Sequence, residues 1–252
     1  MTVHIQNLRG VPFSLKGVLF PVILATLLLW TWTASGKDAV PTIRWTEGNP
    51  GCTFSRGDDG KYRWAVWTDE VAVSLAVDSQ ELQKTRRRHE RIFGVLLNVH
   101  YRGSGTLKVN PQKTTLEFVN HFHTVTNSLH PDYFSKEIQK KADDLADETE
   151  HQIQKHPEKK DEKESYLRDY ANEVSELTRF LSTHSLREAT LDPGNREVSG
   201  WIFFETKSKW IGDWKKQETF LLRFPFKNRV FEFPFTLPPS EGDLILRRRE
   251  LH

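Results

Sequence analysis

The chain switches between two hydrophobic periods, and the order of these periods predicts its fold class. Apolar side chains recur at every second position over residues 52–119 and again over residues 198–235. This period predicts strands, because successive side chains of a strand point to opposite faces. Between these blocks, over residues 131–186, apolar side chains recur with a period near 3.6, which predicts amphipathic helices. Strands are therefore expected on both sides of a helical middle.

The first block contains several short predicted strands joined by turns. Asp58-Asp59-Gly60 indicates a tight hairpin turn, because Asp-Gly tolerates the positive φ angles that such a turn requires. Asp78 followed by Glu81 forms a capping box and predicts a short helix over Asp78–His89. The predicted strands are Cys52–Ser55, Tyr62–Trp67, Val71–Val77, Ile92–Tyr101, Thr106–Val109 and Thr114–Val119.

The second block predicts the strand Val198–Thr206 and a hairpin of Thr219–Phe226 and Arg229–Phe235. Pro225 and Pro234 have no N–H to donate to a ladder, so we expect this hairpin at a sheet edge or on bulges. One face of the strands in both blocks should point into a core. The expected core residues are Val73, Leu75, Val95, Leu97, Val99, Leu116, Phe118, Ile202, Phe204, Leu222 and Phe233.

The helical middle is predicted to be an antiparallel hairpin over residues 131–186. Pro131 suits a first helical turn, and His156-Pro157 interrupts the periodic pattern between two helices. The region Pro131–Glu188 holds 10 Lys/Arg and 15 Asp/Glu, whereas the whole chain has a net charge of +2. We expect the two apolar stripes to bury each other and the hairpin to be an acidic appendage.

Many short strands without β-α-β alternation predict a mainly β fold, an antiparallel β-sandwich with the helical hairpin inserted. The predicted strands within Val109–Val119, together with Leu191-Asp192-Pro193 and the sequence VSGWIFF at residues 198–204, resemble exported bacterial immunoglobulin-like β-sandwich proteins of uncharacterised function. In those domains a Pro-Gly turn precedes a V-x-G-x-I-x-F strand. The resemblance implies an immunoglobulin-like sandwich, and any binding role taken from it is an analogy of fold.

The N-terminal region predicts export. Val18–Trp32 is a run of 15 largely apolar residues, and the only charged residues before it are Arg9 and Lys16. A spanning helix needs about 20 residues, so residues 1–36 are interpreted as a signal peptide or a retained membrane anchor. We expect a linker over 37–51, the sandwich over 52–240 and a basic tail over 241–252. The protein would then be anchored in the cell envelope or secreted.

His121 and His123 are the best candidates for metal ligands. On a strand, positions i and i+2 lie on one side, so both imidazoles and Glu117 could bind one ion, with His100 or His130 completing the set. The alternative is that these are half-exposed polar side chains at the end of a strand. A metal-dependent hydrolase built on His121 and His123 is therefore one alternative function.

Trp210 and Trp214 are candidates for a ligand-binding platform. They lie in a predicted loop with Lys209 and Lys215, where two indole rings bordered by cations could bind a sugar or a peptide. The alternative is that the tryptophans fold back onto the sandwich, since large aromatic side chains favour burial.

The remaining sequence favours a module that is not an enzyme and carries no cofactor. It contains no Gly-x-Ser-x-Gly elbow and no glycine-rich phosphate loop, and Cys52 is its only cysteine. The small net charge predicts no nucleic-acid partner. We expect contact with a membrane through the N-terminal segment and binding to an unidentified protein or glycan. Self-association into a homo-oligomer through the helical hairpin is a further alternative.

Overall fold

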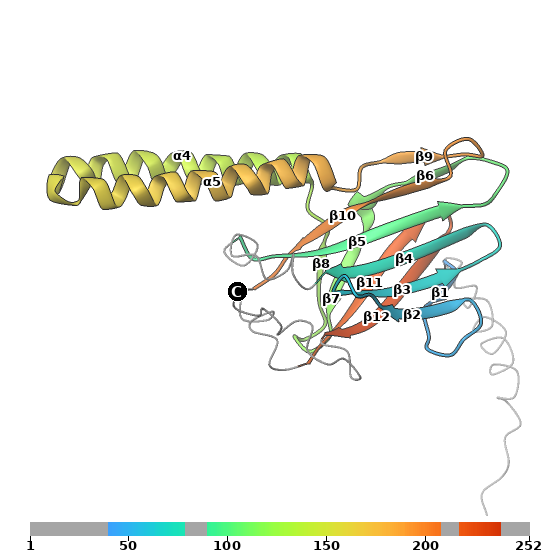
Figure 1. Ribbon diagram of the computed structural model, residues 1–252. Coiled ribbons are helices and arrows are strands. Elements are labelled where there is room, and N and C mark those ends of the chain that lie inside the picture. The colour runs from blue at the N-terminus through green and yellow to red at the C-terminus, as the bar shows by residue number, and fades with distance from the viewer. Residues whose placement is uncertain (1–39, 79–89, 208–216, 238–252) are drawn as a thin grey trace, which may run out of the picture. The chain divides into compact units, whose positions relative to one another are not determined.

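Two five-stranded sheets and a two-stranded ribbon form the β part of the protein (Figure 1). A computed structural model describes residues 40–78, 90–207 and 217–237. The described residues belong to one compact unit. The predicted signal or anchor, the helix expected after Asp78, and the basic tail lie outside the described residues.

Sheet A has the strand order β1-β12-β11-β7-β8, and sheet B has the order β10-β5-β4-β3-β2. All neighbours are antiparallel except β1, which runs parallel to β12. Sheet A consists of β1 (Thr42–Arg44), β7 (Thr115–Phe118), β8 (Thr124–Asn127), β11 (Glu218–Phe226) and β12 (Arg229–Leu237). Sheet B consists of β2 (Cys52–Arg56), β3 (Lys61–Trp67), β4 (Val71–Asp78), β5 (Ile92–Tyr101) and β10 (Glu197–Glu205), and the ribbon pairs β6 (Leu107–Val109) with β9 (Ala189–Leu191).

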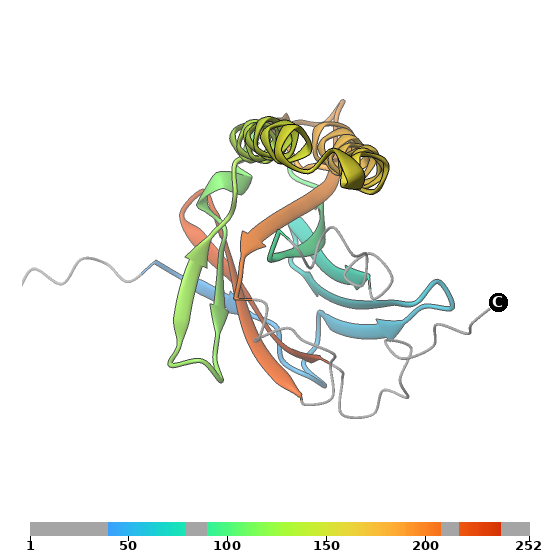
Figure 2. The ribbon, with the colours of Figure 1, turned by 90° about the vertical axis from the view of Figure 1, so that its left-hand side faces the viewer.

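The core lies between the inner faces of the two sheets, which face each other in Figure 2. All eleven residues expected in the core from the period of two are buried in this one cluster, so that prediction is confirmed. Aromatic rings join the sheets: Phe93 of β5 stacks on Phe220 of β11 with centroids 5.0 Å apart, and the Trp64 ring of β3 lies 5.2 Å from that of Phe235 of β12. The fold is thus mainly β and sandwich-like.

The helical hairpin is confirmed, with α4 (Pro131–Lys155) and α5 (Lys160–His184) joined by the short 3-10 turn η2 (Pro157–Lys159). The expectation that its stripes bury only each other was incomplete. The base of the hairpin packs on the outer face of sheet B, while its far end projects beyond the sheets (Figure 1). This second cluster contains Ile92, Phe134, Ile138, Val174, Leu177, Leu181, Trp201 and Phe203.

The strand β10 explains this docking, because both of its faces are apolar. Ile202 and Phe204 face the core between the sheets, whereas Trp201 and Phe203 contact the helices. Phe180 of α5 meets the Trp201 and Phe203 rings edge-on, with centroids 5.7 and 6.1 Å apart. A strand buried on both faces reads as a continuous apolar run, as Trp201–Phe204 does.

Gly200 allows the chain to pass directly over β10 after α5. Ser185 forms a parallel bridge with Trp201, and the Leu186 amide donates to the Trp201 carbonyl at 2.8 Å. A Cβ on Gly200 would lie 2.5 Å from the Leu186 amide nitrogen, closer than side-chain atoms approach backbone. The glycine of the V-x-G-x-I-x-F pattern is therefore required here for this crossing.

The expectation that Pro225 and Pro234 mark a sheet edge or bulges was wrong, since β11 and β12 are both internal strands of sheet A. The prolines are tolerated because each lies where the neighbouring strand has ended. Opposite β11, β7 begins at Thr115, which pairs with Arg223, two positions before Pro225, so Pro225 lies beyond this end of β7. Beside β12, β1 ends at Arg44, which pairs with Glu232, two positions before Pro234.

Three short strands were not expected. The first, β1, falls within residues 37–51, where we predicted a linker, and the others are β8 and β9. No helix within the described ranges is both long enough and apolar enough to cross a membrane.

Candidate functional site

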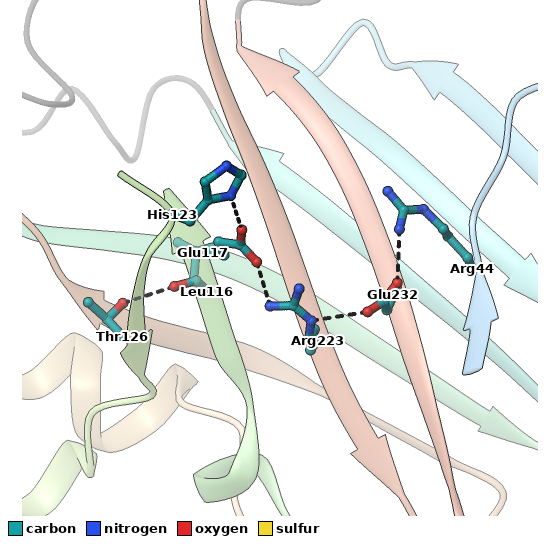
Figure 3. Close-up of polar contacts among 7 residues, drawn as sticks. All are labelled: Arg44, Leu116, Glu117, His123, Thr126, Arg223 and Glu232. Carbon is teal, nitrogen blue, oxygen red and sulfur yellow. Dashed lines mark hydrogen bonds and ion pairs between the residues drawn. The ribbon is translucent and has the colours of Figure 1, made fainter. Parts of the chain in front are cut away.

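A line of alternating charges crosses the outer face of sheet A (Figure 3). Arg44 Nη1 lies 3.2 Å from Glu232 Oε2, and Glu232 Oε1 lies 3.0 Å from Arg223 Nε. Arg223 Nη1 lies 2.6 Å from Glu117 Oε2, and Glu117 Oε1 lies 2.6 Å from His123 Nδ1. We call these five residues the charge ladder.

The register of sheet A places the ladder residues beside one another. Glu232 pairs with Arg223 across β12 and β11, and also with Arg44 across β12 and β1. Opposite charges at directly paired positions stabilise a sheet by roughly 0.2–1 kcal/mol a pair. The hydrogen bond with His123, followed by the bond and charge of Arg223, lowers the pKa of Glu117 below its ordinary value although burial opposes this shift. Each member of the ladder is paired with its neighbour in the line, so the ladder links β1, β12, β11 and β7.

The two candidate metal-binding histidines lie in a turn between β7 and β8, so the assumption that they lie on a strand was wrong. Phe122 and His123 have positive φ angles of 56° and 53°, and the two imidazoles take different partners. His123 pairs with Glu117, whereas His121 Nε2 lies 3.1 Å from Glu218 Oε2. Residues 40–78, 90–207 and 217–237 contain no group of three or more His, Cys, Asp or Glu side chains placed to bind a metal ion.

The other two histidines considered as ligands lie elsewhere. His100 is on β5 of sheet B, where its Nδ1 is 4.0 Å from Glu197 Oε2. His130 is at the N-cap position of α4. The predicted platform of Trp210, Trp214, Lys209 and Lys215 lies outside the described residues.

A groove of about 380 Å³ crosses the outer face of sheet B. Its floor is made of small side chains, because outward positions on adjacent strands carry Ala or Ser. Ala65 of β3 pairs with Ser74 of β4, and Ser74 pairs with Asn98 of β5. The residues lining this groove, which we call the sheet B groove, are Ala65, Trp67, Ala72, Val73, Ser74, Asn98, His100, Arg102 and Glu197.

The larger polar side chains of the groove are held at its two sides. On one side the Arg102 guanidinium lies over the Trp67 ring, with Cζ 5.0 Å from the ring centroid, and Trp67 is 46% exposed. On the other side Asn98 Nδ2 donates to Glu197 Oε1 at 2.5 Å. The groove thus has a cation stacked on an indole on one side and an oriented carboxylate on the other.

The same face of sheet B also carries the base of the helical hairpin. The next outward row of the sheet pairs Ala76 with Leu96 and Leu96 with Trp201. Leu96 and Trp201 pack against the helices, so the groove begins where the helix-covered part of the sheet ends.

Analysis of the sequence did not identify Trp67, Asn98, Arg102 or Glu197 as site residues. The signal that could have located the groove is the large–small alternation of Val71–Val77. Its small side chains, Ala72, Ser74 and Ala76, mark a flat outward face on a strand whose other face is a core. The larger side chains at the two sides of the groove lie on three other strands or at the ends of those strands. A sequence pattern within one segment does not show that these strands are neighbours.

The comparisons with known proteins do not show a family. No protein-family model matches the chain, and no curated protein matches it. One solved structure that it resembles is described as that of a "putative lipoprotein (ycdA)" from Bacillus subtilis subsp. subtilis str. 168, with 12% identity and a TM-score of 0.30. That match covers 74% of this chain and 38% of the other, so the chain spans well under half the length of that protein. The resemblance to immunoglobulin-like proteins stays a prediction.

Proposed function

We propose that this protein is a non-enzymatic binding module, exported to the cell envelope or secreted, whose ligand occupies the sheet B groove. Export rests on the apolar run Val18–Trp32 with Arg9 and Lys16 before it. Binding rests on one observation, a groove with a floor of small side chains and with Arg102 and Glu197 already held by neighbours. Groups fixed before binding lose less conformational entropy when a ligand arrives.

The position of the groove favours binding over catalysis. Ser74 and His100 both line it, which invites comparison with a Ser-His-carboxylate triad. Acyl transfer also requires N–H donors aimed at the developing oxyanion. On the face of a sheet the backbone N–H groups lie in the plane of the ladder, and here β4 is paired with both β3 and β5. The floor around Ser74 therefore offers side chains for contact but lacks a cluster of free amides.

Filling the groove tests its role. Ser74→Trp adds a large side chain at the centre of the floor, and Val125→Trp is a matched control on an exposed position of β8 in sheet A. Amide chemical shifts of the full chain are measured with a peptide probe, trialanine, and a sugar probe, cellotriose. At least one probe should shift groove resonances in the unchanged protein and the control, and neither should do so in Ser74→Trp. Shifts that persist in Ser74→Trp would place binding elsewhere.

Export is tested independently of the groove. A reporter enzyme that works only outside the cytoplasm is fused after His252, and we expect it to show activity. The basic residues before the apolar run favour a cytoplasmic N-terminus, so the rest of the chain should be exported. Activity of a reporter that works only in the cytoplasm, with none outside, would contradict export while leaving the groove proposal untouched.

A further inference from the structure

The two sides of the sheet B groove carry opposite charges, and this arrangement bears on the ligand. Arg102 brings a guanidinium, and Glu197 brings a carboxylate that is 57% exposed. A simple anion would meet Glu197 and a simple cation would meet Arg102, so neither is matched by both sides. A ligand with a negative end and a positive end is matched by both.

The strand spacing sets the length of that ligand. Trp67, Ala72, His100 and Glu197 form one row across β3, β4, β5 and β10. Neighbouring strands lie about 4.8 Å apart, and the Glu197 carboxylate contacts Asn98 and His100 of β5, so it lies two strand spacings, roughly 10 Å, from the backbone of Trp67. The Arg102 guanidinium is positioned over Trp67, at the far end of this row. An extended peptide advances about 3.3–3.6 Å per residue, so three or four residues bridge the groove, whereas a single amino acid is too short.

Each charged side chain is oriented for a peptide terminus. The Arg102 guanidinium lies over the Trp67 ring, and its planar fork of N–H groups matches the geometry of a carboxylate. The Asn98 amide holds Glu197 Oε1, and the Glu197 carboxylate can still accept from an ammonium group. Both termini of a peptide are charged at neutral pH, since the α-carboxyl pKa is about 3.5 and the α-amino pKa about 8.

We infer that the sheet B groove binds a short peptide of three or four residues with free termini, its carboxylate at Arg102 and its ammonium at Glu197. This inference rests on the proposed function, because it names the ligand of that groove. The small floor at Ala65, Ala72 and Ser74 lets the peptide backbone approach the sheet. A sugar is less well matched, because stacking it on the Trp67 face that carries Arg102 would displace the guanidinium.

The test measures binding of trialanine to the full chain by titration of amide chemical shifts. Trialanine amide lacks the carboxylate and N-acetyl-trialanine lacks the ammonium. Each should bind at least about tenfold more weakly than trialanine, since a charge-assisted hydrogen bond contributes about 1.5–3 kcal/mol. Free alanine should bind more weakly than either.

Variants assign the two ends. Arg102→Gln should weaken trialanine about tenfold but leave the affinity for trialanine amide unchanged. Glu197→Gln should weaken trialanine similarly but leave the affinity for N-acetyl-trialanine unchanged. Arg196→Gln and Glu205→Gln remove equal charges from exposed positions near the groove and at the far end of β10, and both should bind trialanine normally. Amide spectra of the free variants verify that each is folded.

Three outcomes would overturn the inference. Equal binding of capped and free peptides would remove the role of the termini. Cellotriose alone could shift groove resonances, in which case the groove is a ligand site of another class and the proposed function survives. If neither probe shifts groove resonances, the peptide inference fails together with its premise.

Discussion

Gly200→Ala tests the close crossing of the chain over β10. The added Cβ would lie 2.5 Å from the Leu186 amide nitrogen, 2.6 Å from its Cα and 2.9 Å from the Ser185 carbonyl carbon. All three are backbone atoms, so no side chain can rotate away to relieve the contact. The segment after α5 must move off the strand.

The magnitude follows from three contributions. Overpacking of this kind typically costs about 1–3 kcal/mol. Displacing Leu186 also weakens its 2.8 Å hydrogen bond to the Trp201 carbonyl, which contributes about 1 kcal/mol. Replacing glycine by alanine restricts the unfolded chain and offsets about 0.4–1 kcal/mol of this loss. We expect a net decrease of about 1–3.5 kcal/mol in the free energy of unfolding.

Urea denaturation followed by circular dichroism measures this change as a lower midpoint at an unchanged slope. Gly105→Ala is the matched control, because its Cβ would meet only the Tyr101 hydroxyl, at an ordinary 3.6 Å. Its free energy of unfolding should stay within about 0.5 kcal/mol of that of the unchanged chain. The reasoning is refuted if Gly200→Ala is as stable as the unchanged chain, or if the control loses as much.

Three further predictions follow from the two cores and the charge ladder. Leu97→Ala should lower the free energy of unfolding by about 2–5 kcal/mol, measured by urea denaturation, because Leu97 is fully buried between the sheets; an unchanged midpoint would contradict this. Replacing residues 132–187 by a Gly/Ser linker should leave a cooperatively melting β-domain that binds a hydrophobic dye, since Trp201 and Phe203 lose their cover; a domain that binds no dye would show that these rings are covered otherwise. The lowered pKa of Glu117 stabilises the fold above the ordinary carboxyl pKa of 4.5, and this contribution is lost as pH falls through the lowered value. Glu117→Gln should therefore destabilise the protein more at pH 7 than at pH 3, and equal effects at both would show that the ladder carries no such linkage.

The periodicity of apolar residues predicts those strands and helices that have one buried face and one exposed face. Ile92–Tyr101 was predicted with the bounds that β5 has, because Val95, Leu97, Val99 and Tyr101 recur at every second position. The strand Thr124–Asn127 was missed, since it contains one apolar residue, Val125, and that side chain is 52% exposed. A strand of three residues such as Ala189–Leu191 is too short to show any period.

The sites depend on contacts between distant segments, which the sequence does not display. Glu117 and Arg223 are more than 100 residues apart but lie 2.6 Å from each other, because β7 and β11 are neighbours. His121 and His123 were assigned to one side on the assumption of a strand, and the positive φ of His123 shows why a turn separates them. The docking of the hairpin could have been foreseen from the double-faced run Trp201–Phe204, which leaves an apolar face that the sandwich core does not use.

Pro225 and Pro234 have a consequence for association between copies of the chain. The backbone amides of a strand point alternately to the neighbouring strands on its two sides. On β12 the Val230 amide donates to the Pro41 carbonyl, on the side of β1, so position 234, four residues later, faces the same side. Each proline therefore removes the first outward donor past the end of the shorter neighbouring strand, β7 or β1. A strand of another copy would find no hydrogen-bond donor at Pro225, where β11 extends beyond β7, or at Pro234, where β12 extends beyond β1. These two positions therefore protect the protein against the edge-to-edge pairing from which aggregates grow.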